Sequence, residues 1–69
     1  MKISARNVLS GKIKSIKSGA VNDEIVVKLP SGDEIVAIIT KESSKGLKLS
    51  KNKKVYAIIK ASNVMIGID

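Results

Sequence analysis

Apolar residues in this chain gather in short segments that are typical of β-strands rather than long helices. The runs Ile25–Leu29 and Glu34–Thr40 are rich in β-branched residues and flank Pro30-Ser31-Gly32-Asp33, a cluster with turn chemistry. Together these segments predict a β-hairpin. Further strands are predicted over Asn7–Lys17, over Val55–Lys60 and, as a short fifth strand, over Val64–Ile68.

Small residues and capping residues predict how these strands are connected. Gly11, inside the first strand, predicts a bulge or bend that would let one strand serve two parts of a curved sheet. The stretch Thr40–Leu47 opens with a capping residue and closes with a glycine, which predicts one or two helical turns. Asn52, in the polar loop that follows, is a candidate for a left-handed backbone conformation. Five strands with one short helix between the third and fourth predict an all-β fold, a five-stranded OB-like Greek-key barrel forming a single domain over residues 1–69.

Two of the predicted strands are apolar on both faces. Ile35 and Ile39 fall on one face of their strand while Val36 and Ile38 fall on the other, and the strand that begins at Val55 repeats this pattern. One barrel interior can cover only one of these faces, so a second copy of the chain is the simplest cover for the other. We therefore expect a homo-oligomer; the alternative is a loosely covered edge face, because isolated surface apolar residues are common.

The amino-acid composition excludes several classes of function. The chain has 13 Lys and Arg residues against 6 Asp and Glu, a formal charge of +7, and neither histidine nor cysteine. Ser–His and Cys–His catalysis is therefore excluded, and zinc and copper sites lose their usual ligands. The carboxylate pairs Asp23-Glu24 and Asp33-Glu34 are interpreted as solvated. We therefore expect that the protein is not an enzyme. The longest apolar run, Ile35–Ile39, is too short to cross a membrane, and the first residues lack the apolar run of a signal peptide, so we expect no membrane partner and a cytoplasmic location.

The positive charge predicts an anionic partner, of which nucleic acid is the first to consider. Proteins that bind single strands stack bases on aromatic or arginine side chains, and Tyr56 and Arg6 are the only residues of these kinds here. The run Lys51–Lys54 is interpreted as a solvated loop. A nucleic-acid-binding OB domain remains an alternative, but the residues suit a small inorganic oxyanion better.

An oxyanion needs several short hydrogen-bond donors and one or two cations. Three segments offer hydroxyls beside cations, although each alone is more often a cap or a turn. They are Ser4-Ala5-Arg6-Asn7, Lys60-Ala61-Ser62-Asn63 and Thr40-Lys41-Glu42-Ser43.

These segments also carry a resemblance to a known family. "SARN" at Ser4–Asn7, "AIITKESSKGLKL" at Ala37–Leu49 and "IIKASNVMIGI" at Ile58–Ile68 are similar to the opening, central and closing motifs of the Mop/TOBE molbindin domains. The resemblance implies an OB-like fold that binds molybdate, or tungstate in its place. It also implies hexamers, built as trimers of dimers, with the oxyanions held between subunits.

The resemblance further implies which residues bind the oxyanion. One subunit would contribute Ser4, Ala5, Arg6, Lys60, Ala61 and Ser62, and another would contribute Thr40, Ser43 and backbone N–H near Lys41. A second class of site would involve the turn Ser18-Gly19-Ala20-Val21-Asn22. Asn52 and Lys48 stand where the family usually has glycine.

Molybdate suits such a donor set because it is a tetrahedral dianion with no proton at neutral pH. A pocket of donors without a carboxylate satisfies its four oxygens, whereas the proton of hydrogenphosphate would face a donor, at a cost of about 1–3 kcal/mol. The expected function is molybdate or tungstate binding for intracellular storage and homeostasis. The alternatives are a ligand-sensing module acting in trans on a transporter or regulator, and the nucleic-acid-binding domain considered above.

Overall fold

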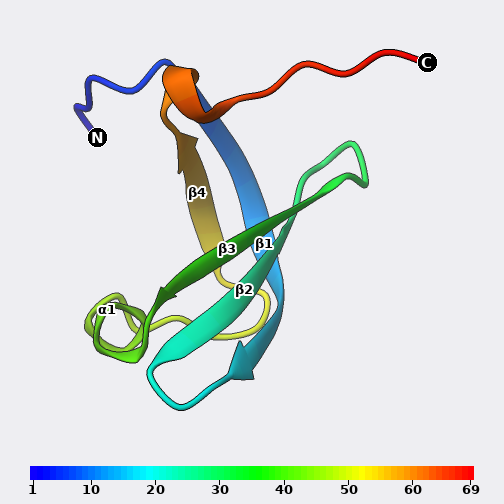
Figure 1. The fold of residues 1–69 in the computed structure, drawn as a ribbon. Helices are drawn as coiled ribbons and strands as arrows, with labels where there is room; N and C mark the ends of the chain where they lie inside the picture. The colour runs from blue at the N-terminus through cyan, green and yellow to red at the C-terminus, as the bar shows by residue number, and fades with distance from the viewer.

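The longest strand, β1, organises the sheet in this computed structural model, which describes residues 1–69. β1 (Asn7–Ser18) pairs antiparallel through its first half with β4 (Lys54–Ile59) and through its second half with β2 (Asn22–Lys28). β2 pairs in turn with β3 (Glu34–Thr40), which gives the sheet order β3-β2-β1-β4. Because β1 changes its partner near its middle, the sheet curls around one interior (Figure 1).

The middle of β1 confirms that one strand serves two parts of a curved sheet, but the irregularity is not where we predicted it. The register of β1 against β2 shifts between Ile13 and Ser15, not at Gly11. Gly11 is buried instead, and a Cβ at this position would lie 2.6 Å from the carbonyl oxygen of Lys28. The glycine is therefore required by the close approach of two backbones.

The predicted hairpin is confirmed as β2 and β3. Its turn is closed by two backbone hydrogen bonds: the Leu29 amide donates to the Asp33 carbonyl at 2.8 Å, and the Gly32 amide donates to the Leu29 carbonyl at 2.9 Å. Gly32 has φ of 95°, a conformation that glycine adopts without steric cost. The turn residues therefore fix the register of the hairpin, as their chemistry predicts.

The predicted short helix is confirmed as α1 (Lys41–Gly46), which begins after the capping residue Thr40. The Thr40 hydroxyl accepts a hydrogen bond from the Ser43 amide at 3.0 Å. After the helix, Lys48 and Asn52 both adopt left-handed conformations, with φ of 53° and 72°. The conformation expected at Asn52 is therefore confirmed, and Lys48 adopts a conformation that glycine would adopt more easily.

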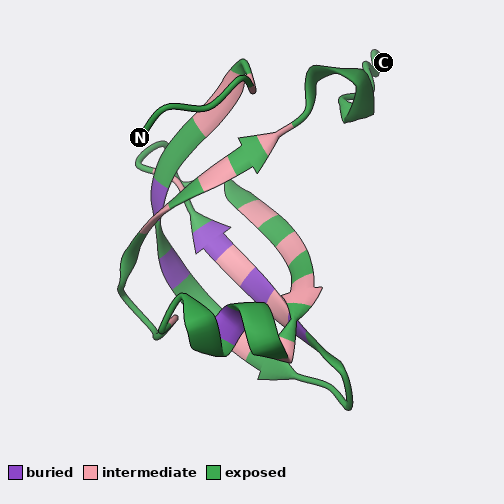
Figure 2. Ribbon diagram, turned by 90° about the vertical axis from the view of Figure 1, so that its left-hand side faces the viewer, coloured by how far each residue is buried: buried purple, intermediate pink, exposed green.

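The interior of the curled sheet is small. Ile13, Ile25 and Val27 are its three buried apolar residues, and they come from β1 and β2, the strands that carry buried segments in Figure 2. Partly buried side chains surround them, namely Ile16, Leu29, Ile35, Ala37, Ile39, Leu49 and Val55.

The predicted fifth strand is wrong for the single chain. A short 3₁₀ helix, η1 (Ala61–Asn63), follows β4, and residues 64–69 then run away from the sheet as an extended tail (Figure 1). The side chains of Met65, Ile66 and Ile68 are about nine-tenths exposed. The apolar composition of this segment is typical of a strand, but a strand also needs a partner with which to form backbone hydrogen bonds. The segment pairs with neither edge strand, so β3 and β4 remain open edges. The barrel is therefore not closed by a fifth strand.

The structure contains no helix that is long and apolar enough to cross a membrane.

Candidate functional site

The end of the β1–β4 ladder places two cations side by side. Asn7 and Ile59 form the last pair of the ladder, so Arg6 and Lys60 directly flank it. Both side chains are exposed, and neither forms an ion pair. Sheet pairing therefore joins two sequence segments that lie more than fifty residues apart.

Hydroxyl groups accompany these cations on both segments. Ser4 precedes Arg6, and Ser62 lies in η1 directly after Lys60; both serines are exposed. η1 begins with a hydrogen bond from the Asn63 amide to the Lys60 carbonyl at 2.9 Å, and the side chain of Lys60 caps none of its backbone groups. We call the segments Ser4–Arg6 and Lys60–Ser62 the strand-end donors.

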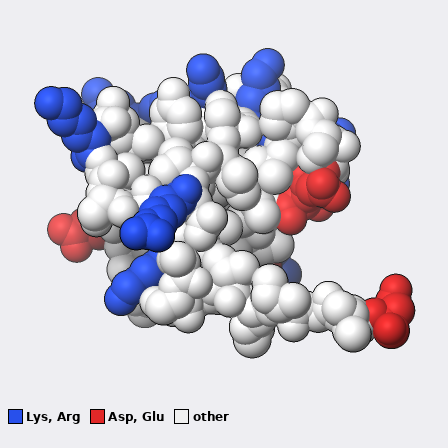
Figure 3. Space-filling model, turned by 90° about the horizontal axis from the view of Figure 1, so that it is seen from above, with Lys and Arg blue, Asp and Glu red and all other residues white.

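The charge around the strand-end donors is favourable for an anion. Figure 3 looks down on the end of the molecule that carries the N-terminal segment and η1. Acidic side chains in this view lie at the margins and at the tip of the tail, whereas basic side chains also lie nearer the middle. Neither segment of the strand-end donors contains an acidic residue, so a dianion bound between them would meet donors rather than carboxylates of these segments.

The third donor segment lies at the start of α1. Thr40 accepts from the Ser43 amide and also donates its own proton to the Ser43 hydroxyl oxygen at 2.9 Å. The two hydroxyls are adjacent and exposed. The Lys41 amide is already used, because it donates to the Val21 carbonyl at 2.9 Å. We call the hydroxyls of Thr40 and Ser43 the helix-start donors; the Ser43 proton is free, whereas Thr40 could donate to a ligand only by rotating its proton away from Ser43.

The strand-end donors and the helix-start donors do not meet within one chain. In two views at right angles, the N-terminal segment and η1 lie at one end of the molecule and α1 lies at the other (Figures 1 and 2). A site that uses both sets of donors would require two chains.

The turn proposed for a second class of site, residues 18–22, has a different character. The Gly19 amide donates to the Asn22 carbonyl at 2.8 Å, and the turn borders an open hollow of about 340 Å³. Asp23 and Glu24 also line this hollow, and carboxylates repel a dianion. The charge of this hollow is therefore less favourable than that of the strand-end donors.

Asp23 corrects one of our expectations. We interpreted the pair Asp23-Glu24 as solvated, but Asp23 is only 7% exposed, and its Oδ1 atom has no hydrogen-bond partner. The sequence does contain the signal for this burial. Asp23 has the same parity along β2 as Ile25 and Val27, so its side chain points to the same, inner face.

The TOBE domain model matches residues 3–66, nearly the whole chain. The chain belongs to the TOBE domain family. Among its relatives, a probable molybdenum-pterin-binding protein of Haemophilus influenzae is 42% identical over 69 residues, which is the full length of both proteins.

Two solved structures share this fold at similar identity. The molybdate-binding protein of Sporomusa ovata superposes with a TM-score of 0.92 at 40% identity, covering 99% of this chain and 100% of that one. The cytoplasmic molybdate-binding protein ModG, with molybdate bound, superposes with a TM-score of 0.95 at 43% identity. This TOBE domain covers 49% of the ModG chain, so the likeness extends over about half of that protein.

Proposed function

We propose that this TOBE domain binds molybdate, with tungstate accepted in its place, at sites shared between copies of the chain. The observation that carries this proposal is the pair Arg6 and Lys60, two cations free of ion pairs and flanked by exposed serines at one strand end. Its relatives are named as molybdate-binding or molybdenum-pterin-binding proteins, which supports the same ligand.

The chemistry of the donors supports a fully deprotonated oxyanion. Arg6 supplies a planar fork of N–H groups, Lys60 supplies a compact positive charge, and serine hydroxyls can rotate to donate. Molybdate and tungstate have four oxygens that only accept hydrogen bonds. The donors therefore match these ions without leaving a proton facing another proton, which would happen with hydrogenphosphate.

The exposed surface of the single chain supports a homo-oligomer. Its accessible area is 5682 Å², whereas a monomeric protein of 7.3 kDa is expected to expose roughly 4,200 Å². The exposed surface includes apolar residues of the sheet: Val36, Ile38, Tyr56 and Ile58, on the outer faces of β3 and β4, are each at least 43% exposed. We call these four residues the outer apolar face. Burial against further copies would remove it from water.

Separation of the two donor sets supports a site formed between subunits. The strand-end donors carry the cations, and the helix-start donors carry two adjacent hydroxyls at the opposite end of the same chain (Figure 1). A hexamer built as a trimer of dimers would let the strand end of one chain face the helix start of another. The ion would then stabilise the assembly, because it contacts two chains at once.

Storage and homeostasis of the ion in the cytoplasm is the role that we propose for this assembly. The donors suit an anion, and the relatives are named as binding proteins, so binding is the proposed activity. ModG, a relative with molybdate bound, is described as cytoplasmic, which supports the proposed location.

Native mass spectrometry of the full chain with molybdate, tungstate, sulfate and phosphate tests the proposal. We expect an oligomer that retains molybdate and tungstate in fixed numbers and retains phosphate at least about tenfold less well. A monomer with and without molybdate would refute the shared site. An oligomer that retains none of the four ions would refute oxyanion binding.

A further inference from the structure

A row of lysines crosses the sheet at the point where β1 changes partner. Lys12 of β1 is the direct cross-strand partner of Lys28 on β2 and also of Lys54 on β4. Directly paired residues in an antiparallel ladder project from the same face of the sheet. All three side chains are exposed, so three lysines on adjacent strands project from the outer surface of the sheet.

Carboxylates do not neutralise this row. The single ion pair of the chain joins the Lys14 ammonium to a Glu34 carboxylate oxygen at 2.6 Å. It neutralises the charge of Lys14, which lies beside the row, and leaves the three charges of the row unpaired. The Lys54 ammonium lies 5.8 Å from the centre of the Tyr56 ring, a weak contact beside the row. Like charges on directly paired residues destabilise a sheet, and a bound anion would relieve their repulsion.

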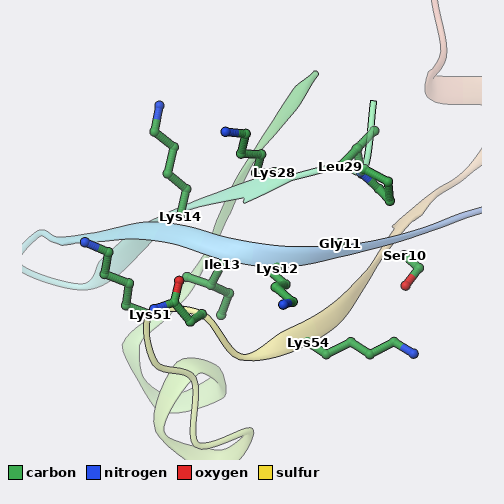
Figure 4. A pocket seen from close by; sticks show the side chains of 11 residues that line it. Ser10, Gly11, Lys12, Ile13, Lys14, Lys28, Leu29, Lys51 and Lys54 are labelled. Carbon is green, nitrogen blue, oxygen red and sulfur yellow. The ribbon is translucent and has the colours of Figure 1, made fainter. Parts of the chain in front are cut away.

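The lysines line a groove. An open cavity of about 560 Å³ lies along the middle of β1, within the range of cavities that hold small molecules. In Figure 4, Lys14 and Lys28 project on the β2 side of β1, while Lys12 and Lys54 lie on the β4 side. Lys51 contributes a fifth ammonium from the loop before β4. We call these five residues the lysine groove.

From this geometry we infer that the lysine groove binds a compact polyphosphate group, such as a diphosphate or triphosphate. Lys14 is held by Glu34, but the other four ammonium groups form no ion pair, and on their flexible stems they can surround an anion that carries several charges in a small volume. The groove contains no arginine to form a planar fork and no aromatic residue on which a base could stack. Recognition would therefore rest on the density of negative charge, which is higher in a polyphosphate than in a nucleic-acid strand of similar size.

The lysine groove is separate from the proposed molybdate site. None of the strand-end or helix-start donors lines it, and it lies at the middle of β1 rather than at the end of the sheet. The two sites are therefore expected to fill independently. The inference does not depend on molybdate binding.

Isothermal titration calorimetry of the full assembly with inorganic tripolyphosphate tests the inference. Titrations are made with and without saturating molybdate, at low and at physiological ionic strength. We expect binding in both molybdate conditions, stronger than that of orthophosphate and weakened by salt. Replacing Lys12, Lys28 and Lys54 together by glutamine should weaken binding about tenfold or more, because three charge-assisted contacts are lost.

The matched control replaces Lys2, Lys17 and Lys45 by glutamine, which removes the same charge from exposed lysines outside the groove. An equal loss of affinity in the two triple variants would overturn the inference, because net charge alone would then explain the binding. Loss of tripolyphosphate binding when molybdate is present would also overturn it by showing one common site. Tighter binding of a single-stranded oligonucleotide than of tripolyphosphate would assign the groove to nucleic acid instead.

Discussion

Asn7 and Ile59 form the last pair of the β1–β4 ladder, and this pairing places Arg6 next to Lys60. Two cations from opposite ends of the sequence are thus brought together by the strands that they directly flank. The hydrogen bonds and packing of the sheet offset the repulsion between these two positive charges, so no carboxylate is needed to hold them in place. This preorganisation is the basis of the proposed oxyanion site.

Replacement of Arg6 by alanine should weaken molybdate binding about tenfold to a hundredfold, because charge-assisted hydrogen bonds contribute about 1.5–3 kcal/mol. The melting temperature without ligand should not change, since Arg6 is exposed and forms no ion pair. Titration calorimetry measures the affinity, and Lys2→Ala serves as the control for loss of one positive charge nearby. Unchanged affinity in Arg6→Ala would remove this residue from the site.

Gly11 should tolerate no side chain. A Cβ at this position would lie 2.6 Å from the Lys28 carbonyl oxygen and 2.8 Å from the Val27 side chain. Gly11→Ala should therefore lower the free energy of unfolding by about 1–3 kcal/mol, as overpacking does in other cores. Urea denaturation measures this change. Gly46→Ala is the control, because a Cβ there meets no atom within 4 Å, and equal stability of both variants would contradict the close approach of β1 and β2.

The outer apolar face should be an interface between chains. Ile38 is 62% exposed and lies directly opposite Glu24 in the ladder. Ile38→Lys should therefore leave the single chain folded, since a lysine opposite a glutamate is tolerated in a sheet, but it should dissociate the oligomer. Sedimentation velocity measures the assembly, with Ser50→Lys as a control in an exposed loop. An intact assembly in Ile38→Lys would show that this face is not an interface.

Local sequence signals predicted the local parts of the fold. The Pro30–Asp33 turn, the Thr40 cap and the left-handed Asn52 each depend on residues close in sequence, so their conformations could be predicted from residue type. The sequence also showed that β3 is apolar on both faces. Alternate residues of a strand point to opposite faces, and both alternating sets are apolar here.

Features that depend on pairing between distant segments could not be predicted in the same way. The bulge after Ile13 and the row through Lys12 follow from the register of β1 against two different strands, which residue types alone do not specify. The segment 64–68 has the composition of a strand, but it pairs with neither of the open edges of its own chain, β3 and β4. The family resemblance implied that one subunit contributes both Arg6 and Lys60 to a site, but residue types alone did not show that the residues beside them are paired in a ladder.

The central claim is that each molybdate site combines the strand end of one chain with the helix start of another. Two variants test it, because each adds a carboxylate to one half of the site: Arg6→Glu at the strand end and Ser43→Asp at the helix start. Ser43 is the third residue of α1, where a negative charge is favourable, so the second variant should keep its helix. Each variant alone should fail to retain molybdate.

The decisive measurement mixes the two variants in equal amounts, unfolds and refolds them together, and counts retained molybdate by native mass spectrometry. In a shared site, the intact strand end of the Ser43→Asp chain meets the intact helix start of the Arg6→Glu chain. Random assembly then restores about one site in four. If each site lies within one chain, every chain carries a defect and the mixed assembly retains no molybdate, which would contradict the account.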